Sequence, residues 1–153
     1  MRIRRVEPVD LDAWAAMRRA LYSDADADEL RRECAHFFAH APATEAVFVA
    51  EGSDGRLVGL VELGLRSYAE GCRSSPVPYL EGWYVAPEAR RSGVGRALVE
   101  AAEAWALALG HFEIASDALI DNRVSHDAHA ALGFEEIERS VHFRKALPRR
   151  QPK

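Results

Sequence analysis

The sequence predicts an α/β protein in which a central mixed sheet is flanked by helices. Strand-like apolar runs and amphipathic stretches follow one another in the order β-αα-β-β-β-α-β-α-β. No internal repeat or linker divides the chain, and 153 residues are enough for one domain with a real core. We therefore expect a single domain over residues 1–153, with a basic, disordered tail at 148–153.

The first part of the chain predicts one strand and two helices. The strand runs from Arg2 to Val6. The stretch "LDAWAAMRRAL" then carries apolar residues at helical spacing, and we expect Asp10 to be its N-cap. The next stretch, "SDADADELRRECAHFFAH", opens with carboxylates that suit the N-terminus of a second helix.

The middle of the chain predicts a hairpin, a polar loop and a third strand. The runs "EAVFVAEG" and "RLVGLVELGL" are joined by Ser53-Asp54-Gly55, which is a strong turn signal. The polar stretch "RSYAEGCRSSPVP" contains many turn-forming residues, and the strand "YLEGWYV" follows it.

The last part of the chain alternates helices and strands. An amphipathic helix begins at Val94 and ends at Gly110. We expect a strand at "FEIASDA", a short helix over "NRVSHDAHAAL" that stops at Gly133, and a final long strand at "FEEIERSVHFRKAL".

The bulk composition argues against several classes of partner. The formal charge is 20 − 24 = −4, so nothing points to nucleic acid or an anionic membrane, and a cationic small molecule suits the chain better. Cys34 and Cys72 lack metal-ligand spacing and fit reduced thiols. With no signal-peptide pattern and no apolar run approaching 18 residues, we expect a soluble cytoplasmic protein. We also expect no metal, because His126 and His129 lie one turn apart without an obvious carboxylate or cysteine to complete a zinc site.

The stretch "VAPEARRSGVGRAL" predicts an anion site between a strand and a helix. Helix N-termini present unpaired N–H groups and a positive dipole end, and two glycines let the backbone approach a ligand closely. Arginines around the same point match phosphate oxygens. The Gly-Lys-Ser/Thr of a Walker loop is absent, and Leu98 stands where a dinucleotide motif has its third glycine.

The spacing Arg-x-x-Gly-x-Gly, at Arg90, Gly93 and Gly95, resembles the pyrophosphate-binding motif of the GCN5-related N-acetyltransferase (GNAT) superfamily, together with Asn122 and the later "ALGF". The resemblance extends in element order from Ile3 to Leu147, and it implies a GNAT-like acyl-CoA N-acyltransferase fold with acetyl-CoA as co-substrate. It also implies a set of cofactor contacts. These are the pantetheine arm at Tyr84 and Val85, the pyrophosphate at Arg90, Arg91, Ser92, Gly93, Val94, Gly95 and Arg96, and the cofactor arm again at Asn122.

Two carboxylates follow from the strand pattern as candidates for handling an amine. Glu81 lies in the strand "YLEGWYV" and Asp117 ends the strand "EIASD". If these are adjacent parallel strands that separate around the cofactor, both side chains reach the acetyl end, where open α/β sheets place their sites. Carboxylates there can hold an ammonium group and accept its proton, directly or through water.

A narrower resemblance starts from these residues. The stretches "SYAEGCRSSPVPYLEGWYV", "ASDA" and "HAALGFEEIERSVHFRK" look like those of the aminoglycoside 6′-N-acetyltransferases. This implies acetylation of the 6′-amine of 2-deoxystreptamine antibiotics, which confers resistance, by direct transfer in a ternary complex of a homodimeric enzyme. Glu81 and Asp117 would then lie in the acceptor pocket, with Asp117 the favoured base. Tyr22, Tyr68 and Glu138 would line that pocket.

Some roles stay open at this level. His129 stands where many superfamily members have a tyrosine that protonates the thiolate, so it is either the leaving-group acid or a helix-packing residue. Alternatives to the aminoglycoside are another small amine, a polyamine or a peptide N-terminus. A further alternative is a non-catalytic acetyl-CoA-binding module.

Overall fold

A computed structural model describes residues 1–40 and 42–148 of the chain, and these divide into two units, the first ending at Ala118 and the second beginning at Leu119. The first unit contains the whole sheet, and the second contains one helix and an extended segment.

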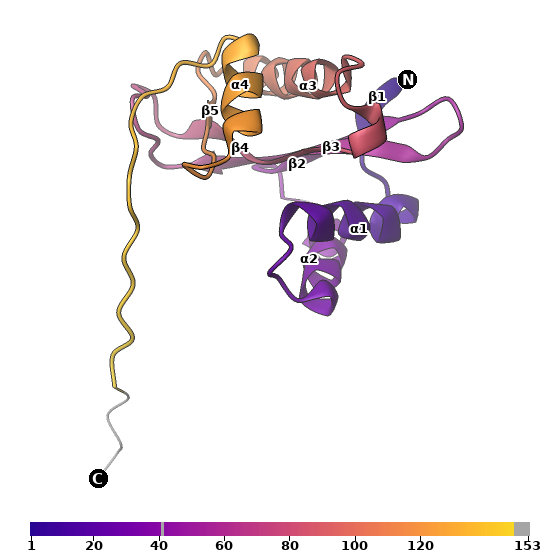
Figure 1. The fold of residues 1–153 in the computed structure, drawn as a ribbon, viewed down its shortest axis with the longest axis horizontal. Coiled ribbons are helices and arrows are strands. Elements are labelled where there is room, and N and C mark those ends of the chain that lie inside the picture. The colour runs from indigo at the N-terminus through magenta and orange to yellow at the C-terminus, as the bar shows by residue number, and fades with distance from the viewer. Residues whose placement is uncertain (41, 149–153) are drawn as a thin grey trace. The chain divides into compact units, whose positions relative to one another are not determined.

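The first unit is a five-stranded mixed sheet with helices on both faces. Its strands lie in the order β1-β2-β3-β4-β5, antiparallel except for the parallel pair β4–β5. Helices α1 and α2 cover one face and α3 covers the other (Figure 1). The elements are β1 (Arg2–Arg5), η1 (Pro8–Asp10), α1 (Leu11–Leu21), α2 (Ala27–His40), β2 (Ala46–Glu51), β3 (Leu57–Arg66), β4 (Val77–Val85), η2 (Pro87–Ala89), α3 (Val94–Ala108) and β5 (Ala115–Ser116).

Apolar side chains fill the space between the sheet and each helical layer. On the α1–α2 face, Trp14, Cys34, Val49 and Leu60 belong to one buried cluster, and the Trp14 ring meets Phe37 edge-on at 5.3 Å between centroids. On the other face, α3 buries the stripe that its 3.6-residue period predicts. Its buried members are Val94, Leu98, Val99, Ala102, Trp105 and Ala106.

Most of the predicted elements of this unit are confirmed, and Asp10 is the N-cap residue of α1 as predicted but lacks the capping hydrogen bond. The Asp26 carboxylate accepts a hydrogen bond from the Glu29 N–H at the start of α2, as the acidic stretch predicts. Asp10 precedes α1, but its carboxylate makes no cap hydrogen bond because it is bound by the Arg4 guanidinium at 2.6 and 3.0 Å and by the Glu7 N–H. An ion pair therefore replaces the expected capping hydrogen bond.

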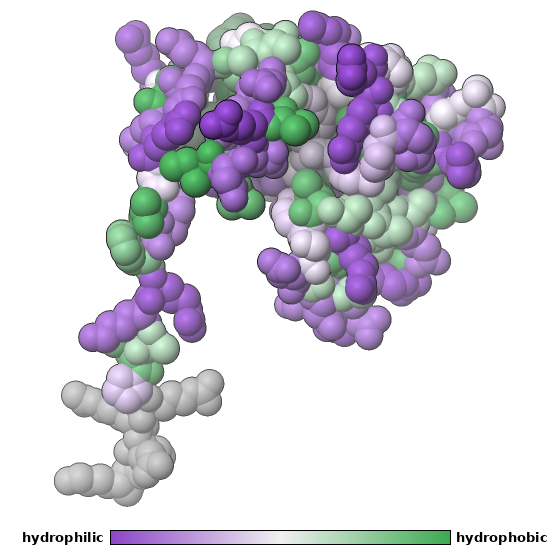
Figure 2. Space-filling model, viewed as in Figure 1, coloured by the Kyte–Doolittle hydropathy of each residue, from purple (hydrophilic) through white to green (hydrophobic). Residues whose placement is uncertain are grey.

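The second unit confirms the short helix and contradicts the final strand. Helix α4 (Arg123–Ala131) begins after Asn122, whose side chain accepts a hydrogen bond from the Ser125 N–H. The described residues 134–148 form no strand, because a strand needs backbone partners and none is paired with them here. Hydrophobic and hydrophilic residues alternate along this segment (Figure 2). The expected tail at 148–153 lies outside the described residues, apart from Pro148.

Two further findings concern the cysteines and the lengths of the apolar helices. Cys34 and Cys72 are both free thiols, as expected from their spacing. None of the helices in the described part of the chain has the length and apolar composition needed to cross a membrane.

Candidate active site

The two predicted carboxylates lie where β4 and β5 stop pairing. The parallel register joins Tyr79 to Ala115 and Leu80 to Ser116, and within the described residues it extends no further. Glu81 and Asp117 are the next residues along their strands. The predicted separation of the two strands is thus confirmed. From Glu81 onward β4 is hydrogen-bonded to β3 on its other side, so the edge toward β5 can accept an extended ligand.

The loop between β4 and α3 is fixed by its own side chains. The Arg90 Nε donates to the Val85 carbonyl oxygen at 3.0 Å, and the Ser92 hydroxyl donates to the Ala89 carbonyl oxygen at 2.6 Å. Arg91 and Gly93 have positive φ angles of 62° and 90°. Left-handed backbone is costly for arginine and natural for glycine, so the loop is held in one defined shape.

The N-terminus of α3 has the features of an anion site. Gly93 is the N-cap and offers no side-chain acceptor to the first-turn N–H groups. These donors, the positive end of the helix dipole and the arginines of the loop favour a bound anion. The arrangement agrees with the pyrophosphate contacts that the sequence resemblance implies for Arg90 to Arg96.

A β-bulge turns Glu81 onto the α1–α2 face of the sheet. Glu62 lies opposite Gly82 and Leu63 lies opposite Leu80, so Glu81 is the extra residue of β4. At Gly82 an added Cβ would lie 2.8 Å from the Tyr22 hydroxyl oxygen and 3.1 Å from a Glu62 oxygen. Only glycine leaves room there, and the Tyr22 hydroxyl donates to the Glu81 carbonyl oxygen at 3.1 Å.

Arg66 and Tyr79 connect the two carboxylates. The Arg66 Nε and Nη2 donate to the two Glu81 oxygens at 2.8 and 2.5 Å, and the Arg66 guanidinium carbon lies 3.5 Å from the Tyr79 ring centroid. The Asp117 charge acts on the Tyr79 hydroxyl. Burial, followed by the Asp117 charge, raises the pKa of Tyr79 to about 12, so this phenol stays protonated at neutral pH.

A buried carboxylate lies beneath the bulge. The Glu62 Oε1 accepts from the Trp14 Nε1 at 2.6 Å and lies 2.9 Å from the Arg18 Nε. Burial raises the pKa of Glu62, while the Arg18 charge and the Trp14 hydrogen bond oppose that shift. Burial together with the Glu62 charge raises the pKa of Tyr22 to about 12. Glu62 therefore provides the buried polar surface against which Tyr22 and Gly82 pack.

An acidic cavity of about 590 Å³ extends from Glu81 along the α1–α2 face. Four glutamates and one arginine line it, and although Glu33 and Glu62 are paired with Arg18 and Glu81 with Arg66, the excess of acids favours a cationic ligand. These residues are Glu33, Glu45, Glu62, Glu81 and Arg18. 

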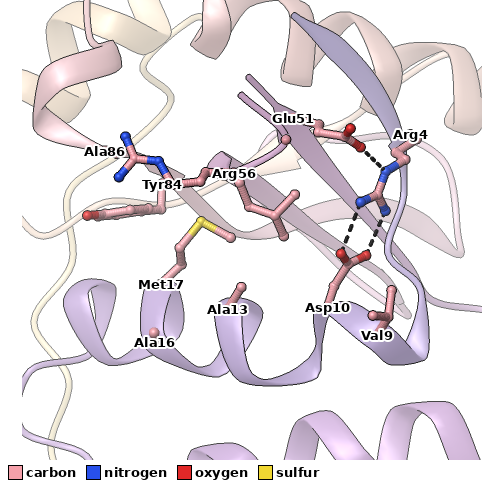
Figure 3. Close-up of a pocket in the computed structure, with 12 residues that line it drawn as sticks. Arg4, Val9, Asp10, Ala13, Ala16, Met17, Glu51, Arg56, Tyr84 and Ala86 are labelled. Carbon is pink, nitrogen blue, oxygen red and sulfur yellow. Dashed lines mark hydrogen bonds and ion pairs between the residues drawn. The ribbon is translucent and has the colours of Figure 1, made fainter. Parts of the chain in front are cut away.

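A second cavity, of about 680 Å³, lies on the same face near β1 and the start of α1. Its acids are already paired, because the Arg4 guanidinium binds both Asp10 and Glu51, and Met17 and Tyr84 form its apolar side (Figure 3). This cavity contains none of the predicted acceptor residues.

The other predicted site residues are placed separately. Tyr68 lies in the loop between β3 and β4 with 67% of its surface exposed. Asn122, His129 and Glu138 belong to the second unit. There the Nδ1 of His129 lies 2.7 Å from the Ser125 carbonyl oxygen, and its ring meets Phe134 edge-on. These contacts support the helix-packing reading, and the catalytic role of His129 stays a prediction.

Three residues of the site, Arg66, Tyr79 and Glu62, were not predicted from the sequence. A signal for two of them is present in "ELGLR", where Glu62 and Arg66 share one strand face in an otherwise apolar run. Tyr79 gives no such signal, since a tyrosine in a strand is an ordinary core residue. Among the described residues, no cluster of histidine, cysteine and carboxylate side chains is arranged to hold a metal ion.

Comparisons with known proteins agree with this geometry. Residues 11–134 match the model of the Acetyltransferase (GNAT) family. The chain is 47% identical over 148 residues to an aminoglycoside N(6′)-acetyltransferase type 1 of Stenotrophomonas maltophilia, covering 95% of this chain and 93% of that protein. It is 46% identical over 146 residues to a protein of the same name from Klebsiella aerogenes, covering 95% and 96% of the two chains.

A solved structure gives the same result at the level of the fold. AAC(6′)-Iy in complex with the bisubstrate analogue CoA-S-monomethyl-acetylneamine superposes with a TM-score of 0.87 at 34% identity, covering 95% of this chain and 98% of that chain. The motif, the parting of β4 and β5 and these likenesses lead to one conclusion: the chain belongs to the GNAT family of acetyltransferases.

Proposed function

We propose that this protein transfers the acetyl group of acetyl-CoA to the 6′-amine of aminoglycoside antibiotics and thereby confers resistance. The observation that carries the proposal is the placement of Glu81 and Asp117 at the point where β4 and β5 part. The acidic cavity that continues from Glu81 supports a polycationic acceptor. Relatives of 46–47% identity carry the corresponding name.

The donor is held by backbone and by arginine. The N–H groups at the start of α3 and the side chains between Arg90 and Arg96 bind the pyrophosphate of acetyl-CoA. The free backbone edge at Tyr84 and Val85 pairs with the amides of the pantetheine arm, as an added strand would. Asn122 contacts the same arm. These contacts place the thioester beside Glu81 and Asp117.

The acceptor reacts by direct attack. Glu81 and Asp117 hold the 6′-ammonium, and Asp117 takes a proton from it, directly or through a water molecule. The free amine attacks the thioester carbonyl carbon and forms a tetrahedral intermediate. The C–S bond then breaks, the amine nitrogen loses its remaining extra proton, and the CoA thiolate is protonated. His129 is the candidate for that last proton transfer, and Tyr22, Tyr68 and Glu138 contact the acceptor rings.

We also propose that the enzyme acts in the cytoplasm as a single-domain chain and as a homodimer. The segment 134–147 carries exposed apolar side chains, including Val141 (73%), Phe143 (93%) and Leu147 (78%), on a stretch that the sequence predicts as a strand. Pairing of this segment with a second copy would bury them. Analytical ultracentrifugation tests this: Phe143→Glu should give a monomer, while Ser140→Glu should stay dimeric. A monomeric wild type would contradict the proposal.

Thiol release from acetyl-CoA tests the main proposal. Release should depend on kanamycin, tobramycin or neomycin and should be absent with paromomycin, which matches neomycin except for a hydroxyl in place of the 6′-amine. Absence of turnover with every 6′-amino aminoglycoside would refute the proposal. Far faster acetylation of a polyamine or a peptide N-terminus would identify a different acceptor.

A further inference from the structure

We infer that Arg66 determines acceptor specificity: it occupies the ammonium position on Glu81 in the free enzyme, and an acceptor must displace it. The inference rests on the proposed function, because it concerns the acceptor of that same site. It makes Arg66 an internal competitor that favours acceptors with several positive charges over those with one.

The contact between Arg66 and Glu81 uses both carboxylate oxygens. The Nε and Nη2 groups donate to Oε1 and Oε2 at 2.8 and 2.5 Å, which is the parallel two-bond geometry of an arginine–carboxylate pair. An ammonium group of an acceptor seeks the same oxygens. While the pair is closed, Glu81 therefore attracts a cation much less than a free carboxylate would.

The pair is also open to exchange. The side chains of Arg66 and Glu81 are 44% and 36% exposed, so water competes with the contact and the pair is weak. Exchange with an acceptor cation is thus feasible without unfolding any part of the site.

Arg66 makes a second contact at the same time as its hydrogen bonds to Glu81. Its guanidinium lies 3.5 Å from the centroid of the Tyr79 ring, and Tyr79 is only 3% exposed. A guanidinium over a tyrosine face is itself attracted. Arg66 can therefore release Glu81 and stay beside Asp117, whose charge also acts on it.

The balance of charge explains the selection. Arg66 neutralises one of the two carboxylates, Glu81 and Asp117, so an amine with a single charge exchanges one ion pair for another and gains little. An acceptor with further ammonium groups gains the adjoining cavity, whose four glutamates outnumber its single arginine, Arg18. Displacing Arg66 costs the same free energy for both acceptors. Only the polycation regains that free energy, because its further ammonium groups interact with the cavity.

The test compares Arg66→Gln and Arg66→Lys with Arg56→Gln. Arg56 is paired with Asp54 in the β2–β3 hairpin, so its substitution removes the same charge away from Glu81. Kinetics are measured with tobramycin and with 6-amino-6-deoxyglucose, which carries one ammonium group. Calorimetric titration of tobramycin into each protein in the presence of CoA gives binding without turnover.

Arg66→Gln should lower the acceptor KM about three- to tenfold for the single-charge sugar and less for tobramycin, so that the preference for the polycation shrinks. Arg66→Lys should fall between Gln and wild type. The KM for acetyl-CoA and the thermal unfolding midpoint should not move, which a structural role of Arg66 would not predict.

Three results would overturn the inference. They are an acceptor KM or Kd that rises or stays constant in Arg66→Gln, an unchanged preference between the two acceptors, and an equal change in Arg56→Gln. A wild type that binds tobramycin but releases no thiol would defeat the proposed function instead, and the calorimetric comparison would still decide the role of Arg66.

Discussion

The donor side and the acceptor side of this site are built in opposite ways. The core of the proposed donor side is one continuous stretch, Val85 to Leu98, which offers the N–H groups of a helix start and a left-handed Gly93 at its N-cap. The acceptor side gathers side chains from α1, β3, β4 and the end of β5 around a bulge at Glu81. A substitution on one side should therefore leave the binding of the other substrate intact.

Asp117→Asn should break the acceptor side most strongly. An asparagine keeps the size of the side chain and cannot accept the proton, so we expect kcat to fall by about a hundredfold or more. Calorimetry should give an unchanged Kd for CoA, because the donor loop is untouched. Asp54→Asn in the β2–β3 hairpin is the matched control and should keep full turnover. Unchanged kcat in Asp117→Asn would remove this residue as the base.

High pH should destabilise the acceptor side through Tyr22 and Tyr79. Each has a pKa of about 12 in the folded chain, against an ordinary value near 10. Between these values the unfolded state has lost protons that the folded state keeps, so stability falls as pH rises from about 10 to about 12. Each of the two tyrosines contributes at most about 3 kcal/mol to this loss, and solvent screening of the half-buried Tyr22 lowers its share.

Urea unfolding of wild type and Tyr79→Phe at several pH values measures this loss. The phenylalanine variant keeps the ring beneath Arg66 and removes one titrating hydroxyl. Its free energy of unfolding should therefore decline less steeply above pH 10. Parallel curves for the two proteins would show that Tyr79 ionises normally in the folded state.

Gly93→Ala should weaken the binding of CoA on the donor side. Gly93 has a φ of 90°, where an alanine is strained by about 1–2 kcal/mol. Gly55, at a φ of 79° in the β2–β3 turn, gives the matched variant Gly55→Ala, and both positions have open space for a Cβ. Both should lose similar stability, and only Gly93→Ala should raise the Kd for CoA, by about tenfold. Equal CoA binding in the two variants would show that the loop shape is not needed for the donor.

The same contrast explains what the sequence could predict. The donor loop is local, so its arginines, glycines and following helix could be predicted from one stretch. Glu81 and Asp117 could be predicted because one is a carboxylate within an otherwise apolar strand and the other directly follows a strand. The roles of Arg66 and Tyr79 could not be predicted, because their placement beside Glu81 and Asp117 depends on the strand register and on a β-bulge. Neither can be predicted from the spacing of residues in the sequence.

The prediction of a final strand was wrong for a related reason. Residues 134–147 have the composition of a strand, but a strand also needs a partner with unpaired backbone groups. Composition predicts the conformation and says nothing of the partner. Within the described residues the chain supplies no partner for this segment, which is why the dimer proposal assigns it one in a second copy.

Tyr22→Phe should give the smallest effect and the sharpest test of how the acceptor side is held. The Tyr22 hydroxyl donates to the Glu81 carbonyl oxygen at 3.1 Å, so its loss should loosen the bulge without removing any charge. One neutral hydrogen bond contributes about 1 kcal/mol, and we expect the acceptor KM to rise about two- to fivefold. The KM for acetyl-CoA should stay constant.

Tyr68→Phe is the control for this variant, since Tyr68 is predicted to contact the acceptor from an exposed loop. A larger rise in acceptor KM for Tyr68→Phe than for Tyr22→Phe would mean that direct contact with the rings matters more than the shape of the bulge. The reverse order would mean that the acceptor side depends first on the placement of Glu81. In that case the β3–β4 register, rather than the exposed loop, would set acceptor affinity.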